Sequence, residues 1–411
     1  NTISGEYSTT SPNTSAVSAS GSDVIVTDNG ALTISTTGDA GMGLSVSNGA
    51  KITLDDSGST IRTSGEGSHA ITIVGDNSEA MLNNLTVSTE GEIASAALFS
   101  SNAKGTIDGG SYTATGEGSY GVEILNGADL TIKNATITTS GYGMARAIVN
   151  RYATLSLDNV NINTTGDFGN AGIYNDGELT GSNVTITTTG SQSFGIQNYT
   201  NTFNLAASHV ETYGEQSVGI MNTGRAELTD THIVTHGKNA DAISSDGAKS
   251  TFVLNNGSTI ASGENSRAVA MTNGGALEAN STDITSEQSA AIALESASSA
   301  TVTHSNVSGS NVAFSFSGGK NVATIDGGSI TATASGGSAF AVDSGSADIN
   351  VKNVQTMNAD NLLTVANTTD AVTLRAENSK LSGAVKASGD NVSMTLDANS
   401  QWLLTADSSV G

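Results

Sequence analysis

Short runs of alternating apolar and polar residues recur along this chain with a nearly constant spacing. Between Gly116 and Gly237, five consecutive segments of 23 to 25 residues repeat one pattern, and each segment holds three such runs. In the first segment the runs include Val122, Leu130 and Ile137, and Asn, Asp or Gly residues separate them. Because alternation with a period of two is typical of β-strands, each segment predicts three strands and three turns. Recurrence at this period indicates a repeat architecture.

Three strands per repeat describe one coil of a β-solenoid. We therefore expect an all-β fold, a right-handed parallel β-helix with three short strands per coil. Comparable units extend the pattern in both directions and begin near Gly38, Gly65, Gly91, Gly237, Gly263, Glu287, Ser310 and Ala334. The predicted organisation is an N-terminal cap with the first irregular coils over residues 1–37, followed by a β-helix over residues 38–411.

Composition agrees with this architecture and narrows the chemistry. The chain has a single proline, Pro12, as expected where nearly every residue lies in a strand or a tight turn. It has no cysteine, which excludes disulfides, thiolate metal sites and a cysteine nucleophile. We expect no metal and no cofactor. No apolar run is long enough to span a bilayer and the first residue is not Met, so we expect a mature or trimmed fragment of a longer protein.

The chain is strongly acidic, with 39 acidic and 15 basic residues and a formal net charge of −24. A basic stripe with interleaved aromatic residues is missing, so we expect no nucleic-acid partner. Acidity also opposes binding to anionic membranes, and no direct membrane insertion is expected. Because charges are screened within about 8 Å at physiological salt, a local basic patch can still attract a polyanion.

The first strand of each coil contains three neighbouring columns of equivalent positions. One column is always aliphatic, so its side chains are expected to point inward. It comprises Ile71, Val122, Ile148, Ile173, Ile196, Ile220, Ile243, Val269 and Ile292. The preceding column, which alternation places toward solvent, is always Gly or Ala. It comprises Ala70, Gly121, Ala147, Gly172, Gly195, Gly219, Ala242, Ala268 and Ala291.

The column that follows the aliphatic one is bulky and variable. It comprises Thr72, Glu123, Val149, Tyr174, Gln197, Met221, Ser244 and Ala270. A small row beside a bulky row predicts either a shallow ligand groove or crowding, in which neighbouring loops fold over the small row. The sequence leaves both interpretations open.

Asparagine, or Asp246, recurs close behind these columns. The residues are Asn126, Asn150, Asn175, Asn198, Asn222 and Asp246, with Asn273 further on. Stacked side-chain amides can form a ladder from coil to coil, which is the structural interpretation and the one that we favour. Amides on an outer turn can also bind sugar hydroxyls. A second polar column, which includes Asn134, Asn159 and Asn183, is interpreted in the same way.

The groove interpretation defines a ligand face. An extended polymer would hydrogen-bond to the Asn column, Tyr174 would stack on a sugar face, and Arg146 and Arg267 would offset the negative field for a sulfated or carboxylated chain. The predicted ligand-binding residues are Glu123, Asn126, Arg146, Asn150, Tyr174, Asn175, Gln197, Asn198, Asn222, Asp246 and Arg267.

Catalytic signals are weak, and we predict that the protein is not an enzyme. Asp158, Asp167 and Asp176 fall at different points of their coils, whereas polysaccharide lyases and hydrolases need carboxylates or basic groups that converge on one face. The segment Asp56-Ser57-Gly58-Ser59 resembles a serine protease motif, but Asp55 stands where the motif has Gly. No catalytic residue is therefore assigned.

The end of the chain resembles the closing passenger coils of type V autotransporters. That family has an L-x-G-x-V strand, an alternating V-x-x-x-L strand and an S-x-W-x-x-x-x-D-S coil. The matching segments here are Lys380–Val385, Val392–Asp397 and Ser400–Ser408, with Trp402 at the position of the family's Trp. The resemblance implies secretion to, or display on, the surface of a Gram-negative bacterium, through an autochaperone region and an outer-membrane translocator barrel that are absent from this chain.

The irregular coils, without a leading protease domain, are most similar to the AIDA and antigen 43 branch of adhesins, and within it to UpaB-like uropathogenic adhesins. That resemblance implies a virulence-associated adhesin for host extracellular-matrix components, either glycans such as glycosaminoglycans or proteins such as fibronectin. Weak self-association between solenoids, which would drive bacterial aggregation and biofilm formation, is the alternative. A polysaccharide-cleaving enzyme is the third hypothesis.

Overall fold

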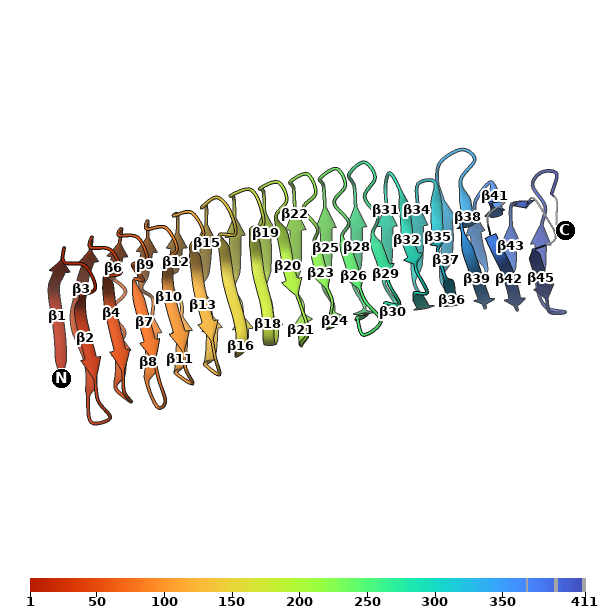
Figure 1. Cartoon of the computed structure of the whole chain (residues 1–411). Coiled ribbons are helices and arrows are strands. Elements are labelled where there is room, and N and C mark those ends of the chain that lie inside the picture. The colour runs from red at the N-terminus through yellow and green to blue at the C-terminus, as the bar shows by residue number, and fades with distance from the viewer. Residues whose placement is uncertain (367–368, 388–390, 409–411) are drawn as a thin grey trace. The chain divides into compact units, whose positions relative to one another are not determined.

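The computed structural model describes residues 1–366, 369–387 and 391–408. Two compact units divide the chain, Asn1–Gly214 (unit 1) and Glu215–Gly411 (unit 2). Within each unit the described strands follow one another in three columns, and each strand pairs in parallel with the equivalent strand of the next coil (Figure 1).

Unit 1 contains strands β1 to β22. Their bounds are β1 Thr2–Thr9, β2 Ser15–Ser20, β3 Ile25–Thr36, β4 Met42–Ser47, β5 Lys51–Leu54, β6 Thr60–Thr63, β7 Ile71–Val74, β8 Glu79–Asn83, β9 Thr86–Thr89, β10 Ser95–Ser100, β11 Lys104–Asp108, β12 Ser111–Ala114, β13 Tyr120–Leu125, β14 Asp129–Lys133, β15 Thr136–Thr139, β16 Arg146–Asp158, β17 Asn161–Thr164, β18 Ala171–Ser182, β19 Thr185–Thr188, β20 Phe194–Asn198, β21 Thr202–Ala206 and β22 His209–Thr212.

Unit 2 contains strands β23 to β46. Their bounds are β23 Ile220–Asn222, β24 Arg225–Thr229, β25 His232–Thr235, β26 Ile243–Asp246, β27 Thr251–Asn255, β28 Ser258–Ala261, β29 Val269–Thr272, β30 Ala276–Asn280, β31 Asp283–Ser286, β32 Ala290–Glu295, β33 Ser299–Thr303, β34 Asn306–Gly309, β35 Val312–Ser317, β36 Lys320–Asp326, β37 Ser329–Ala332, β38 Ser338–Val342, β39 Gly345–Lys352, β40 Thr356–Asn358, β41 Asn361–Val365, β42 Thr369–Glu377, β43 Lys380–Ser382, β44 Ala384–Ala387, β45 Val392–Leu396 and β46 Gln401–Leu403.

The predicted fold class is confirmed as a right-handed parallel β-solenoid. The first column of unit 1 runs through β7, β10, β13, β16, β18 and β20, which lie side by side in Figure 1. Its register places Val122 beside Ile148 and Ile148 beside Ile173, and all three side chains are fully buried. The aliphatic column therefore forms the core as predicted, because each coil buries its apolar face only by stacking on its neighbours.

Glycine opens the coils of unit 1 because successive backbones approach too closely there for a side chain. A Cβ atom at Gly116 would lie 2.0 Å from the carbonyl oxygen of Gly91, and one at Gly141 would lie 1.9 Å from that of Gly116. Neither contact is compatible with a real side chain. The glycine that marks each repeat in the sequence is thus a packing requirement of the stack.

The Gly and Ala column does not face solvent, so the predicted groove floor is wrong. Gly121, Ala147 and Gly172 are all buried. A Cβ atom at Gly121 would lie 2.4 Å from Cγ2 of Ile137, an interior side chain of β15, and 2.6 Å from the carbonyl oxygen of Ala147. Simple alternation fails because the chain turns a corner at this position, which directs two consecutive residues inward. The row is crowded, but by interior side chains and the backbone of the next coil and not by the loops that the sequence interpretation invoked.

The final coils keep the parallel pairing. Strand β46 pairs with β43, which places Trp402 beside Leu381, and the Trp402 indole Nε1 donates a hydrogen bond of 2.9 Å to the Gly383 carbonyl.

Among the described residues, no helix has the length and apolar character that crossing a membrane would require. The division at residue 37 remains a prediction; strands β1 and β3, which precede it, pair in parallel with a register shift between Ile3 and Gly5.

Candidate functional site

The outer face of the first column in unit 1 brings four predicted residues together. Glu123 on β13, Tyr174 on β18 and Gln197 on β20 occupy one outward row, in which Val149 of β16 stands between Glu123 and Tyr174. Arg146 begins β16 and pairs in register with Ala171 of β18.

Two arginines and two tyrosines form the centre of this face, which we call the arginine–tyrosine cluster: Arg146, Arg151, Tyr174 and Tyr199. The Cζ atoms of Arg146 and Arg151 lie 4.2 and 4.9 Å from the centre of the Tyr174 ring. The Tyr174 and Tyr199 rings have centres 5.0 Å apart and are tilted by 40°. Both arginines are within the range of cation–π attraction, which holds the cations and the ring in one assembly.

Polar atoms in and beside the cluster have no partner. Arg146 is 7% exposed, and its Nε atom is buried without a hydrogen bond. Gln197 is 6% exposed, and its Oε1 atom is likewise buried without a hydrogen bond. Burial lowers the pKa of Arg146 from its ordinary value. Among the residues that the structure describes, neither Arg146 nor Arg151 forms an ion pair with a carboxylate. Unpartnered buried polar atoms are rare and costly, so these two atoms make this face a candidate site.

Glu123 lies at the edge of the cluster, where hydrogen bonds through Ser95 connect it to His69. The Ser95 hydroxyl donates a hydrogen bond of 2.7 Å to the Glu123 carboxylate, and the Ser95 backbone N–H donates one of 2.9 Å to Nδ1 of His69. Burial raises the pKa of Glu123, while the Ser95 hydrogen bond and the charge of Arg151 oppose that rise. Burial also lowers the pKa of His69. A carboxyl group with a raised pKa can act as a proton-dependent hydrogen-bonding group.

The asparagines of unit 1 form an internal ladder and cannot contact a surface ligand. Asn150, Asn175 and Asn198 have no exposed surface. The Asn150 Nδ2 donates to the Asn175 Oδ1 at 2.8 Å, and the Asn175 Nδ2 donates to the Asn198 Oδ1 at 2.7 Å. The structural interpretation of this column is confirmed. Its use as a ligand-binding row is wrong, because the inward direction of Ile173 also directs Asn175 inward, two residues later.

The other members of the predicted row occupy different positions. Asn126 is an exposed turn residue with φ of 51°, and the position before it that aligns with Asn150 is Ile124. Asn222 in unit 2 is buried, and its Nδ2 donates to the Ser245 hydroxyl at 3.0 Å. Asp246 lies one residue beyond that ladder position and is exposed. The row is therefore not a single column of ligand-facing side chains.

Arg267 is not available to a polyanion. Its guanidinium lies 2.7 Å from the Asp241 carboxylate and 2.5 Å from the Glu295 carboxylate. The Asp241 and Glu295 charges raise its pKa and, with their hydrogen bonds, outweigh the effect of burial. The sequence-based role for Arg267 is wrong, because two carboxylates already neutralise it.

Two members of the cluster, Arg151 and Tyr199, were not predicted. Each follows directly after an inward asparagine, Asn150 or Asn198, so strict alternation already indicated that both side chains point outward. Comparison of the residues after the Asn column would have found them.

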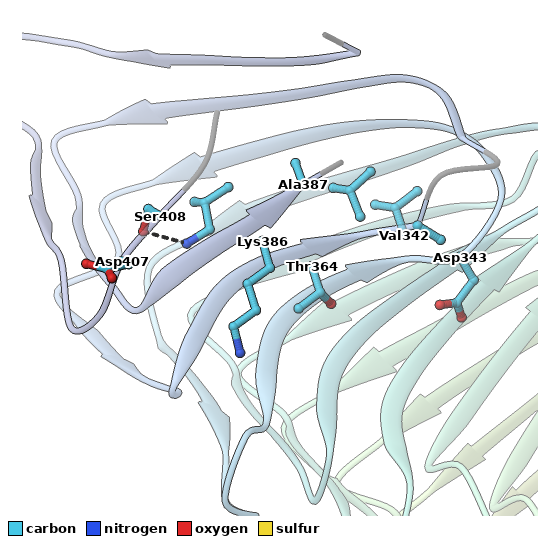
Figure 2. A pocket seen from close by; sticks show the side chains of 10 residues that line it. Val342, Asp343, Thr364, Lys386, Ala387, Asp407 and Ser408 are labelled. Carbon is cyan, nitrogen blue, oxygen red and sulfur yellow. Dashed lines mark hydrogen bonds between the residues drawn. The ribbon is translucent and has the colours of Figure 1, made fainter. Parts of the chain in front are cut away.

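A separate hollow of about 620 Å³ lies in unit 2, beside the described ends of β38, β41 and β44. Figure 2 shows Asp343, Thr364 and Lys386 along it, with Ser408 accepting a hydrogen bond of 3.0 Å from the backbone N–H of Val385. The titratable residues in its lining are Asp343, Lys386 and Asp407, and none of the predicted site residues lies there. Within the described ranges, no group of three or more His, Asp or Glu side chains could hold a metal ion.

No family of known proteins matches the sequence, and no curated protein matches it either. Among solved structures, the chain is similar to Vag8 in its complex with C1 inhibitor, with 17% identity and a TM-score of 0.69 over 94% of this chain and 100% of that one. Tailspike protein 3 of bacteriophage CBA120 aligns over 94% of this chain and 58% of the tailspike, with 8% identity and a TM-score of only 0.31. The likeness to Vag8 shows a shared solenoid fold.

Proposed function

We propose that this chain is a non-catalytic, surface-displayed or secreted adhesin that binds acidic glycans of the extracellular matrix through the arginine–tyrosine cluster. The observation that carries the proposal is the presence of two arginines against one tyrosine ring with no carboxylate ion pair, in a protein of net charge −24. The other four arginines of the chain, Arg62, Arg225, Arg267 and Arg375, each form an ion pair with a carboxylate.

The cluster fits a carboxylated or sulfated sugar. Arg151 is half-buried and can donate two parallel hydrogen bonds to a carboxylate or sulfate, while the charge of the more deeply buried Arg146 adds a long-range attraction. The exposed parts of the Tyr174 and Tyr199 rings offer an apolar surface for the C–H face of a sugar ring. Glu123 and Gln197 lie on the same row and can bind hydroxyl groups.

Two further observations support a binding function. Vag8, which has the same solenoid fold, was solved in complex with C1 inhibitor, so a solenoid of this kind can present a binding surface to a protein. The closing coils resemble autotransporter passengers, which are exported to the cell surface. Matrix proteins such as fibronectin are included in the proposed partner class because they occur together with acidic glycans.

The proposal is tested by titration of the purified chain with hyaluronan, heparin and neutral dextran, followed by surface plasmon resonance. We expect binding to the two acidic polymers, no binding to dextran, and at least about tenfold weaker binding for Tyr174→Ala and for Arg151→Gln. Arg62→Gln is the matched control, because Arg62 is an exposed arginine of unit 1 that pairs with Glu90.

Equal losses for Arg62→Gln and Arg151→Gln would show that only the average charge matters, and would remove the site. Concentration-dependent light scattering of the wild type, without glycan binding, would replace the proposal by self-association.

A further inference from the structure

A ridge of exposed apolar side chains follows the turns that lead into the first column of unit 1. We call it the apolar ridge and define it by Ile93, Tyr142, Met144 and Phe168, which are 66, 55, 60 and 46% exposed. Ile93 precedes β10, Tyr142 and Met144 precede β16, and Phe168 precedes β18. Isolated exposed apolar residues are ordinary, but four large ones in equivalent turns need an explanation.

The four side chains belong to three coils, with the coil of Gly118 between the first two, and the turns of these coils are bonded to one another. The Ile93 N–H donates to the Glu117 carbonyl at 2.9 Å, the Gly118 N–H to the Tyr142 carbonyl at 3.1 Å, and the Met144 N–H to the Phe168 carbonyl at 2.9 Å. The Tyr142 and Phe168 rings have centres 5.2 Å apart. Tyr142, Met144 and Phe168 thus lie on adjacent coils, whereas the coil of Gly118, which has no side chain at this position, separates them from Ile93.

The backbone of the ridge is strained. Ile93, Met144 and Phe168 have φ of 52°, 58° and 67°, in the left-handed region that β-branched and bulky residues avoid. The same turn in other coils contains Gly67 and Gly118, or Asn239 and Asn265, which tolerate this conformation. Large apolar residues here cost backbone free energy in the isolated protein, and about half of their side-chain surface stays exposed. Strain of this kind is typical of functional surfaces.

Carboxylates flank the ridge. Glu92 and Glu117 are exposed next to Ile93 and Gly118, and no ion pair of either side chain occurs within the described part of the chain. Asp167, next to Phe168, is exposed and accepts a hydrogen bond of 2.6 Å from the Ser191 N–H. The surface therefore combines the apolar ridge with negatively charged side chains next to it.

We propose that the apolar ridge docks a protein segment that carries apolar side chains flanked by lysine or arginine. Charge complementarity selects this occupant. A second copy of the chain would place the same carboxylates against each other, and an anionic lipid surface would be repelled by them. This docking surface goes beyond the glycan-binding proposal and shares no residue with the arginine–tyrosine cluster.

The test uses the full chain and fluorescence anisotropy of two labelled peptides, one of alternating Leu and Lys and one of alternating Leu and Glu. The key variant is Ile93→Asn combined with Phe168→Asn, because asparagine adopts this turn elsewhere in the chain. Tyr152→Asn is the control, since Tyr152 is 68% exposed at φ of 52° in a different turn.

We expect the wild type and the control to bind the Leu/Lys peptide and the double variant to bind at least about tenfold more weakly, with an unchanged or higher melting temperature. Hyaluronan binding should be the same in all three proteins, which separates this test from that of the glycan site. Equal binding of the Leu/Glu peptide, absence of peptide binding by the wild type, or equal binding by the double variant would each overturn the proposal.

Two further outcomes would replace the occupant and so overturn the proposal as stated. One is a dimer of the wild type in sedimentation velocity that the double variant loses. The other is binding to vesicles containing phosphatidylserine that the double variant loses.

Discussion

Arg146 and Arg267 hold equivalent places in their coils, each directly before a small buried alanine, yet their electrostatic surroundings are opposite. The Arg267 guanidinium contacts the carboxylates of Asp241 and Glu295, whereas the Cζ of Arg146 lies 4.2 Å from the centre of the Tyr174 ring and has no carboxylate partner among the described residues. One arginine is therefore a structural cation and the other belongs to a candidate binding site.

Arg146→Met should separate binding from stability. Because Arg146 is a buried cation without an ion pair, its removal should leave the free energy of unfolding unchanged or slightly higher. Heparin binding should fall about tenfold, since one of two cations is lost. Chemical denaturation and calorimetric titration measure the two effects. A large loss of stability with intact binding would make Arg146 a purely structural residue.

Arg267→Met is the counterpart at the equivalent position. It leaves Asp241 and Glu295 without their partner, so we expect a loss of about 3 kcal/mol or less in unfolding free energy, because Arg267 is partly exposed. Heparin binding should not weaken. Weaker heparin binding by this variant than by Arg146→Met would contradict the assignment of the site.

Glu123 should make binding of a sulfated glycan depend on pH. Burial raises its pKa above the ordinary value of 4.5, so the carboxyl group takes up a proton at a higher pH than an exposed glutamate does. Below that raised pKa the negative charge is gone, and heparin binding should strengthen as pH falls from neutral through it. Glu123→Gln should bind more tightly at pH 7 and lose this dependence. If His69 caused the effect instead, the dependence would persist in Glu123→Gln.

The asparagine ladder should contribute strongly to stability. Asn175→Ala removes the acceptor for Asn150 and the donor to Asn198 in a fully buried row, so we expect a cost of about 1 to 3 kcal/mol. Asn134→Ala, in an exposed turn where Asn134 donates to Asp108 at 2.7 Å, should cost less than about 1 kcal/mol. Similar thermal shifts for both variants would show that burial does not control the cost.

Tyr112 offers a test in which a substitution is expected to increase the unfolding free energy. Its ring is fully buried on β12 and its hydroxyl has no hydrogen-bond partner; burial also raises the pKa of this phenol. Tyr112→Phe keeps the ring and removes the unsatisfied group, so we expect the unfolding free energy to rise by about 1 kcal/mol or to stay unchanged. A clear decrease in melting temperature would mean that the hydroxyl is satisfied, for example by an internal water molecule.

The sequence by itself determined the repeat, the three strands per coil and the inward aliphatic column, because alternation and a fixed period are local properties of the chain. Ile173 is buried for the reason that its pattern indicated. The same alternation, continued from Ile173 to Tyr174 and Asn175, already placed the tyrosine outward and the asparagine inward. The predicted ligand-binding row is wrong because it combined residues whose side chains point to opposite sides of the strand.

Only the tertiary structure decided which residues meet across coils. Gly172 is buried beside Ile173 because the chain turns a corner there, and a Cβ atom would lie 2.4 Å from Cγ2 of Ile186. Whether an arginine is neutralised depends on side chains about one coil away, as Asp241 and Glu295 are from Arg267. Because coil lengths vary, that register is set by stacking of the backbones, and no local pattern in the sequence determines it.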